Sequence, residues 1–197
     1  MTDTATLSVP ERLIEAATHL FAERGYDATS VAEIVESAGV TKGALYHYFQ
    51  SKEDLLEAIH RKFINAEIAD AEEIMSRGQD LVTTLKAMIT ALIRSIAQYQ
   101  REVTIFFREM HRLPPKAFDD IKKSRDYYAA LMQSVIERGQ NLGVFRTEQS
   151  PRLVTLSLFG TCNWIYTWYN PQGPLSPDEI AEQVSRLILH GICESSS

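Results

Sequence analysis

Residues 38–52 read AGVTKGALYHYFQSK, and this stretch decides the fold. Just before it, Thr29 and Ser30 are good helix N-cap residues, and apolar residues then follow at helical spacing. Gly39 accepts the left-handed conformation in which many helices end, and Thr41 can cap a second short helix. The pattern predicts two short helices joined by a tight turn. In a helix-turn-helix of this kind, the second helix lies in the major groove of DNA.

The second short helix is expected to have a buried face and an exposed face. The residues predicted to point inward are Leu45, Tyr48 and Phe49, and those predicted to point outward are Lys42, Tyr46 and His47. Ser51 is placed to cap a longer third helix. The first turn of that helix holds Glu53 and Asp54, where the helix dipole favours negative charge.

Residues 11–60 resemble the DNA-binding domain of the TetR family of bacterial transcriptional repressors. The resemblance rests on the block ERLIEAATHLFAERGYDATSVAEIVESAGVTKGALYHYFQSKEDLLEAI, and above all on FAERGYDATSV followed by KGALYHYF. It implies DNA-contacting residues that bind phosphates or meet base edges: Thr29, Thr41, Lys42, Gly43, Ala44, Tyr46, His47 and Lys52. Lys42 suits guanine, Gly43 admits a close backbone, and the Ala44 methyl suits a thymine methyl. For the two threonines, capping alone is the open alternative.

Bulk charge does not support nucleic-acid binding. The chain has a formal charge of −6, and its first sixty residues hold four basic side chains against ten acidic ones. Locally the balance differs, because residues 38–52 contain two lysines, one histidine and no carboxylate. Few phosphate contacts per chain imply that a dimer is needed for useful affinity, and that binding weakens with salt.

Beyond residue 60 the pattern stays helical, with glycine and proline at a few clear breaks. Further helices are predicted over about 52–76, 80–98, 101–112, 115–140, 151–169 and 176–193. The expected fold is therefore all-α, with nine helices and a TetR-like arrangement. We divide the chain into a disordered arm (1–9), a helix-turn-helix DNA-binding domain (10–52) and a ligand-binding and dimerisation domain (53–197).

Residues 163–192, NWIYTWYNPQGPLSPDEIAEQVSRLILHGI, resemble a particular subgroup of TetR regulators. That subgroup responds to coenzyme A thioesters in fatty-acid, phenylacetate or steroid breakdown, and shares a Trp-x-x-x-Trp-Tyr-x-Pro-x-Gly-x-x-Ser pattern here. The resemblance implies a small-molecule effector of the acyl-CoA class. A repressor that responds to a hydrophobic drug or another small molecule is the alternative, since ligand classes change on a shared scaffold.

An acyl-CoA site needs an apolar tunnel and cations for phosphates. Between residues 94 and 125 there are eight basic and four acidic residues, interleaved with aromatic side chains. The candidate effector-binding residues are Phe107, Arg108, Met110, Arg112, Arg125, Tyr128, Met132, Trp164 and Trp168. The competing interpretation is that these cations are solvated and the aromatic residues belong to an ordinary core.

The last two predicted helices are apolar over wide arcs. The TetR resemblance implies that they pair with their symmetry mates in a homodimer, through Leu156, Phe159, Val184, Leu187 and Ile188. A two-fold dimer also supplies the second recognition helix that a palindromic double-stranded DNA operator requires.

Other classes of protein fit less well. No run of eighteen apolar residues predicts a membrane span, and no signal peptide is recognisable, so we expect a cytoplasmic protein with reduced thiols at Cys162 and Cys193. Glu57 and His60 have a di-iron spacing, but a second such motif is missing from the sequence. We therefore predict no catalytic residues, no metal and no cofactor. A helical adaptor that binds no DNA is the remaining alternative.

Overall fold

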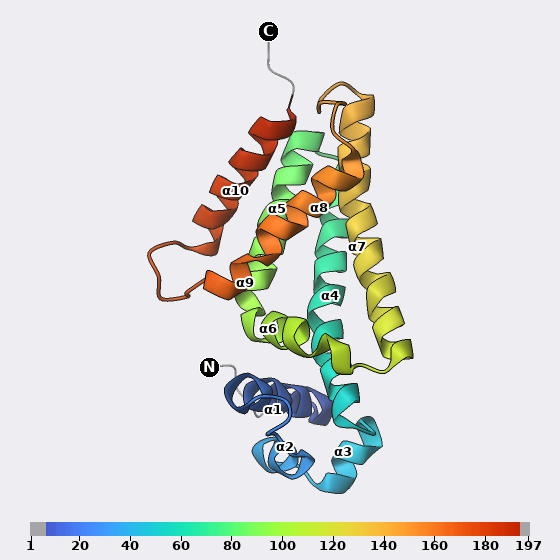
Figure 1. Cartoon of the computed structure of the whole chain (residues 1–197), viewed down its shortest axis with the longest axis vertical. Coiled ribbons are helices and arrows are strands. Elements are labelled where there is room, and N and C mark those ends of the chain that lie inside the picture. Colours follow the sequence, from blue (N-terminus) through green and yellow to red (C-terminus); the bar gives the residue numbers. More distant parts are fainter. Residues whose placement is uncertain (1–6, 194–197) are drawn as a thin grey trace. The chain divides into compact units, whose positions relative to one another are not determined.

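The computed structural model describes residues 7–193, and every regular element in that range is a helix. The helices are α1 (Val9–Arg24), α2 (Val31–Ser37), α3 (Lys42–Tyr48), α4 (Lys52–Ser76), α5 (Leu81–Gln98), α6 (Gln100–Glu109), the short 3-10 helix η2 (Met110–Arg112), α7 (Pro115–Asn141), α8 (Pro151–Asn163), α9 (Ile165–Trp168) and α10 (Pro177–Ile192) (Figure 1). The predicted all-α fold is confirmed for the described residues. The eighth predicted helix is divided at Trp164 into α8 and α9, so the ninth corresponds to α10.

Helix starts follow from side-chain caps close in sequence. Ser8, Ser30 and Ser176 each form a capping box with a glutamate three residues later. The Ser51 hydroxyl accepts from the Asp54 N–H at 3.2 Å, as predicted for the start of α4. The predicted disordered arm lies outside the described residues as far as residue 6, and Val9 is already helical.

The chain forms two compact units, which are described separately. Unit 1 holds the described residues up to Phe63 together with Arg101–Lys122, and unit 2 holds Ile64–Gln100 and the described residues from Lys123 onward. All three divisions, after Phe63, Gln100 and Lys122, fall inside helices, so α4, α6 and α7 each contribute residues to both units. The predicted boundary after residue 52 separates a DNA-binding from a ligand-binding domain, and it stays a prediction. The two units are defined by contacts instead, and contacts group nearly all of α6 and η2 with the first three helices.

In unit 1, α1, α2 and α3 pack on one another around the fully buried Leu13, Ile34 and Leu45. Farther along α4, His60 is also fully buried and stacks on Phe106 of α6 with ring centroids 3.8 Å apart. Aromatic stacking of this kind contributes beyond the burial of apolar area. This ring contact therefore holds α6 against α4 at His60.

In unit 2, α5 is the central helix and contacts α8, α9 and α10. By length and composition α5 could also cross a membrane, but half of it is buried inside the unit, as in the core helix of a globular protein. At the end of α7, Gly139 leaves room for the buried ring of Phe145. Phe145 also forms an isolated antiparallel bridge with Cys193, which joins the segment after α7 to the end of α10.

Candidate nucleic-acid interface and buried polar cluster

The turn between α2 and α3 is closed by backbone hydrogen bonds. Gly39 has φ 63°, and its N–H donates to the carbonyl of Glu36 at 3.1 Å. The next N–H, from Val40, reaches back to the carbonyl of Val35 at 3.0 Å. These two bonds form a Schellman motif, which needs a left-handed residue at the position of Gly39. The predicted helix, tight turn and helix are therefore present.

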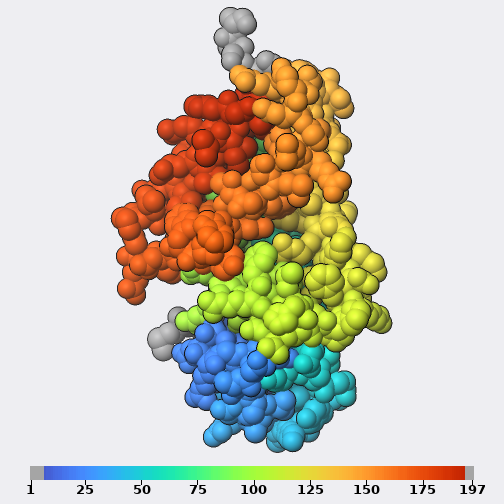
Figure 2. All heavy atoms as spheres, viewed as in Figure 1, coloured from blue at the N-terminus to red at the C-terminus, as the bar shows by residue number. Residues whose placement is uncertain are grey.

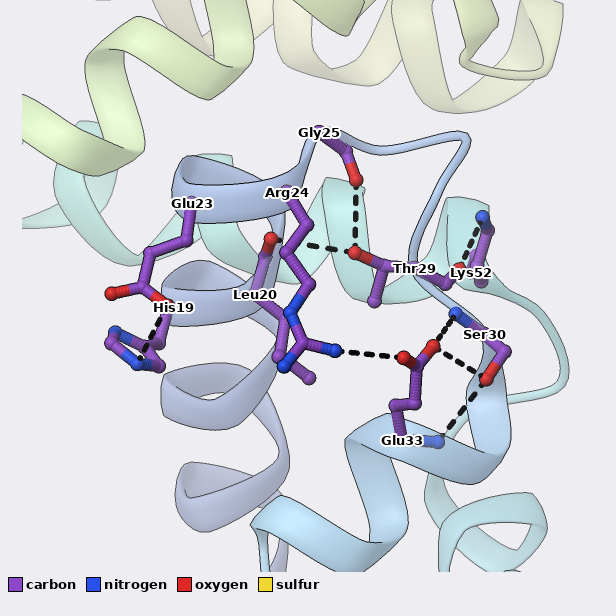
Figure 3. A network of polar contacts seen from close by, with 9 residues as sticks. All are labelled: His19, Leu20, Glu23, Arg24, Gly25, Thr29, Ser30, Glu33 and Lys52. Carbon is purple, nitrogen blue, oxygen red and sulfur yellow. Dashed lines mark hydrogen bonds and ion pairs between the residues drawn. The ribbon is translucent and has the colours of Figure 1, made fainter.

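The start of α2 is tied to α1 by a polar network (Figure 3). The Glu33 carboxylate accepts from the Ser30 N–H at 2.8 Å and also from Arg24 at 2.8 Å. The Ser30 hydroxyl in turn accepts from the Glu33 N–H at 3.2 Å. Ser30 is therefore the N-cap of α2, and Thr29 is not.

The exposed surface of α3 carries most of the predicted DNA-contacting residues. Thr41, Lys42, Gly43, Tyr46 and His47 are exposed, and Ala44 is half-buried. Thr41 also caps the helix, because its hydroxyl accepts from the Ala44 N–H at 3.1 Å. The Lys42 ammonium lies 5.8 Å from the centroid of the Tyr46 ring, which leaves it free to turn toward a base.

One prediction about α3 is wrong. Tyr48 was expected in the core but is 48% exposed, with its ring edge-on to His47 at 4.7 Å between centroids. α3 has only seven residues, and Leu45 is its one fully buried side chain. Phe49 leaves the helix in extended conformation and takes the half-buried place beside Leu45, so Tyr48 is left outside. Tyr48 thereby joins the exposed surface of α3.

Thr29 and Lys52 turn inward, in contrast to the predicted phosphate contacts. The buried Thr29 hydroxyl donates to the carbonyls of Gly25 at 2.9 Å and Leu20 at 3.3 Å (Figure 3). The Lys52 ammonium donates to the carbonyls of Tyr26 at 2.7 Å and Thr29 at 2.8 Å. It also lies 4.2 Å from the centroid of the Tyr26 ring. Both side chains therefore support the loop between α1 and α2 from inside unit 1.

Arg112 supports the same loop from its other side. Its guanidinium binds Asp27 at 2.5 Å and Glu109 at 2.7 Å, and lies 5.2 Å from the Tyr26 ring centroid. Burial and the Glu53 carboxylate, which accepts from the Tyr26 hydroxyl at 2.8 Å, raise the pKa of Tyr26. Arg112 was predicted to bind the effector. The structure places it instead against the α1–α2 loop.

The nine predicted effector residues are divided between the two units. Phe107, Arg108, Met110 and Arg112 belong to unit 1, and the other five belong to unit 2. Arg108 is exposed, while Phe107 is half-buried with its ring edge-on to that of Phe106. Helical spacing cannot show that α6 and η2 group with the first helices, because that depends on long-range packing.

Within unit 2 the structure brings Arg125 and Tyr128 together with an acid that the sequence analysis missed. Glu67 on α4 is only 7% exposed, and it accepts from the Ser95 hydroxyl of α5 at 2.9 Å. Burial raises the pKa of Glu67 to about 7, against the lowering effects of Ser95 and Arg125. Burial lowers the pKa of the half-buried Arg125, and the charge of Glu67 opposes that shift. Burial also raises the pKa of Tyr128.

The sequence contains a pattern that could have identified Glu67 as a buried acid. It falls on the buried stripe of α4, between Phe63, Ile64 and the later Ala71 and Ile74. A carboxylate at an apolar position of a helix is costly unless it has a partner. Met132, a predicted effector residue on α7, is also fully buried in this unit.

Trp164 and Trp168 were predicted to line the effector site, but they lie at the surface of the described chain. Trp164 is 64% exposed and stands between α8 and α9, with its own backbone still in right-handed helical conformation. Trp168 is also exposed, at the end of the four-residue α9. Both indoles are therefore at least half exposed in the described chain, and their predicted contact with an acyl chain stays a prediction.

The faces of α8 and α10 carry exposed apolar side chains (orange and red in Figure 2). Leu156 is 55% exposed and Leu187 is 70% exposed, and a groove of about 370 Å³ runs between these helices beside Leu153 and Ile188. Phe159, Val184 and Ile188 are half-buried. Of the residues predicted for the dimer interface, Leu156 and Leu187 are thus exposed and Ile188 lines the groove, and the interface itself stays a prediction.

Residues 7–193 offer little support for a metal site or a reactive thiol. These residues include no group of three or more His, Cys, Asp or Glu side chains that could hold a metal ion. Both cysteines are free, and burial raises the pKa of Cys162 to about 12, so its thiol is unreactive.

Comparisons with known proteins agree with this architecture. Residues 13–59 match the model for bacterial regulatory proteins of the tetR family, and residues 78–192 match a tetracyclin repressor-like C-terminal domain. The HTH-type transcriptional repressor KstR2 of Rhodococcus jostii is 32% identical over 181 residues, which is 91% of this chain and 89% of that protein.

Two solved structures are similar over nearly their whole length. The ketosteroid transcriptional regulator KstR2 of Mycobacterium tuberculosis has a TM-score of 0.84 and 29% identity, covering 95% of this chain and 96% of that one. AibR, solved in complex with isovaleryl coenzyme A and operator DNA, has a TM-score of 0.80 and 26% identity, covering 91% and 97%. With both halves matched by its models, this chain belongs to the TetR family of bacterial regulatory proteins.

Proposed function

We propose that this TetR-family protein is a homodimeric transcriptional repressor that an acyl-CoA thioester releases from a palindromic operator. The observation that carries the proposal is the carboxylate-free surface of α3, presented by a closed helix-turn-helix turn in a chain of this family. A repressor acts where its DNA is, so the protein would work in the cytoplasm. The similar proteins are named as transcriptional regulators, and we infer no catalytic activity.

On the DNA side, α3 would lie in the major groove. Lys42 would donate to a guanine edge, while Gly43 and Ala44 would allow a close approach to the bases. Tyr46 and His47 would bind phosphate oxygens on either side of the groove. We add Tyr48 to this set because its ring is exposed beside His47. Thr41 remains a candidate phosphate contact in addition to its role as a cap.

A dimer follows from the small number of cations on this surface. Non-specific affinity rises with the number of phosphates neutralised, so one α3 surface gives weak binding. The apolar faces of α8 and α10 offer a self-complementary contact, centred on Leu156 and Leu187. Two recognition helices would then meet half-sites about 34–36 Å apart, which is one turn of DNA.

Release requires that the effector favour a different position of α3. We propose that effector binding in unit 2 moves α4, whose residues 63–75 lead from one unit into the other. The start of α4 holds the α1–α2 loop through Lys52, and η2 holds it through Arg112. A preference of roughly 10⁴-fold for the DNA-incompetent state would nearly invert the populations.

One observation supports a coenzyme A thioester as effector. AibR, a structural neighbour, was solved with isovaleryl coenzyme A and operator DNA. In this chain, effector contacts would come from Arg125, Tyr128 and Met132, which lie inside unit 2. Trp164 and Trp168 would contact the effector only from the surface.

The decisive experiment is operator release by a panel of acyl-CoA thioesters at fixed salt. The panel would use the purified full-length protein on its own upstream DNA, with free coenzyme A and the free acids as controls. Release by one class of thioester, but not by free coenzyme A, is the expected result. Continued binding throughout the panel would reject the acyl-CoA effector. Failure to bind the upstream DNA at all, with the double variant Tyr46→Ala and Lys42→Ala behaving like the wild type, would reject the repressor.

A further inference from the structure

Unit 2 contains a polar site in an otherwise apolar interior. Glu67, Ser95 and Tyr128 are all buried, and they come from α4, α5 and α7. The half-buried Arg125, one helical turn before Tyr128, adds a positive charge to them. Burying an acid and a guanidinium together generally weakens a protein core compared with apolar residues of equal size. A site of this kind in a ligand-binding unit therefore calls for a functional explanation.

The surroundings of the cluster suit a hydrocarbon. Phe159 of α8 lies with its ring 5.5 Å from that of Tyr128, and Met132 and Cys162 are fully buried. A groove of about 690 Å³ runs along α4 and α5 outside the cluster, and Ser95 forms part of its wall. That volume falls in the range of small-molecule sites. Ser95 is the cluster residue that lines this groove, so an elongated molecule lying in the groove would reach the cluster at Ser95, beside Glu67.

We propose that this cluster binds a carboxylate at the far end of the effector's hydrocarbon group, and that the ligand's carboxylate replaces Glu67 as the partner of Arg125. A planar guanidinium donates two parallel hydrogen bonds to a carboxylate, which makes arginine well suited to this exchange. Glu67 takes up one proton from solvent in the same step and stays bonded to Ser95 as a neutral acid. The net charge of the site is then the same before and after the exchange.

The exchange is feasible because Glu67 is easily neutralised. With a pKa of about 7, Glu67 titrates close to neutral pH, so taking up a proton costs it little. The charged groups that act on it are Arg125 of α7, which favours the carboxylate, and Asp70 of α4, which favours the acid. Asp126 also acts on Arg125, and it stays in place during the exchange. The inference takes from the proposed function only that unit 2 binds an effector.

Calorimetric titration of the full-length protein tests the proposal with two matched pairs of probes. The first pair is decanoic acid and decanol, which contain no coenzyme A. The second pair is the mono-CoA thioester of decanedioic acid and decanoyl-CoA. We expect the carboxylated member of each pair to bind at least tenfold more tightly. At pH 8, titrations in buffers of different ionisation enthalpy should show close to one proton taken up per site.

Two variants separate this site from general packing effects. Glu67→Gln should keep the preference for the carboxylated probes but lose the proton uptake, because glutamine is already neutral. Arg125→Met should lose the preference, while Arg125→Lys, which keeps the charge, should retain part of it. Circular dichroism would confirm that each variant is folded.

Failure of this inference can be told apart from failure of the proposed function. Equal affinity within both pairs, or no binding by any of the four probes, would overturn the carboxylate site. Binding of decanoic acid with proton uptake, without operator release by any thioester, would keep the site and reject the acyl-CoA effector.

Discussion

Replacement of Lys52 by methionine tests whether this residue supports the protein or binds DNA. The wild-type ammonium makes two hydrogen bonds, to the carbonyls of Tyr26 and Thr29, and lies over the Tyr26 ring. Bonds from a charged donor contribute about 1.5–3 kcal/mol each, and the contact with the ring adds about 0.5–1 kcal/mol. The two carbonyls regain water in part, which offsets some of this loss. Lys52→Met should therefore cost about 2–4 kcal/mol.

The assay combines thermal unfolding at one fixed protein concentration with operator binding at several salt concentrations. A loss of this size should lower the melting temperature by roughly 5–10 °C in a chain of this length. The slope of log affinity against log salt should stay unchanged, because an inward-facing Lys52 neutralises no phosphate. Lys42→Met is the matched control. Lys42 is exposed, so Lys42→Met should change the free energy of unfolding by no more than about 0.5 kcal/mol and should lose operator affinity.

The opposite pattern for Lys52→Met would refute the reasoning. If the variant melts like the wild type while its salt slope falls by about one unit, Lys52 leaves the loop when DNA binds. The phosphate contact implied by the TetR resemblance would then be correct, and the internal hydrogen bonds would belong to the unbound state alone.

Three further predictions concern packing, assembly and protonation. Gly139→Ala should destabilise the protein by about 1–3 kcal/mol in denaturant unfolding, since its Cβ would lie 2.0 Å from the Phe145 ring, whereas Gly43→Ala should cost nothing. Leu187→Glu should turn the dimer into monomers in sedimentation, whereas Leu142→Glu, equally exposed at the end of α7, should leave it intact. For Glu67 the folded pKa of about 7 lies above the reference value of 4.5, so stability is greatest below about pH 4.5 and falls as the pH rises to about 7. Glu67→Gln should show a flatter stability profile over that window, and an equally steep one would contradict the burial of this acid.

The fold was predictable because its signals are local. Capping residues such as Ser30 and Ser176, and the glycine at 39, mark helix ends within a few residues of the bonds that they make. Tyr48 was misplaced because helical spacing alone did not separate it from Phe49. At the end of a helix of seven residues, either side chain can take the buried side, and the extended backbone at Phe49 decides which one does.

The proposed effector site was harder to predict, because its residues come from distant segments. The mixture of cations and aromatic residues led to Arg125 and Tyr128, which the structure brings near Glu67, but the same criterion also selected Arg112, which faces the α1–α2 loop. Composition cannot tell these arginines apart. What separates them is the partner, and Asp27 is 85 residues away from Arg112 in the sequence. Glu67 could have been identified without knowledge of its partners, because it is an acid on the apolar stripe of a helix.

The position of Glu67 on α4 bears directly on how an effector signal would reach DNA. Lys52, the first residue of α4, holds the α1–α2 loop, and Glu67 follows fifteen residues later, roughly 22 Å along the same helix. A helix is stiff over this length, so an event that shifts α4 at Glu67 also shifts the anchor of the loop. The exchange of partners at Arg125 is such an event, because Glu67 then loses an attraction across to α7. Since the loop also leads into α2 through the cap at Ser30, we expect a change at the anchor to move the helix-turn-helix without any contact between effector and DNA.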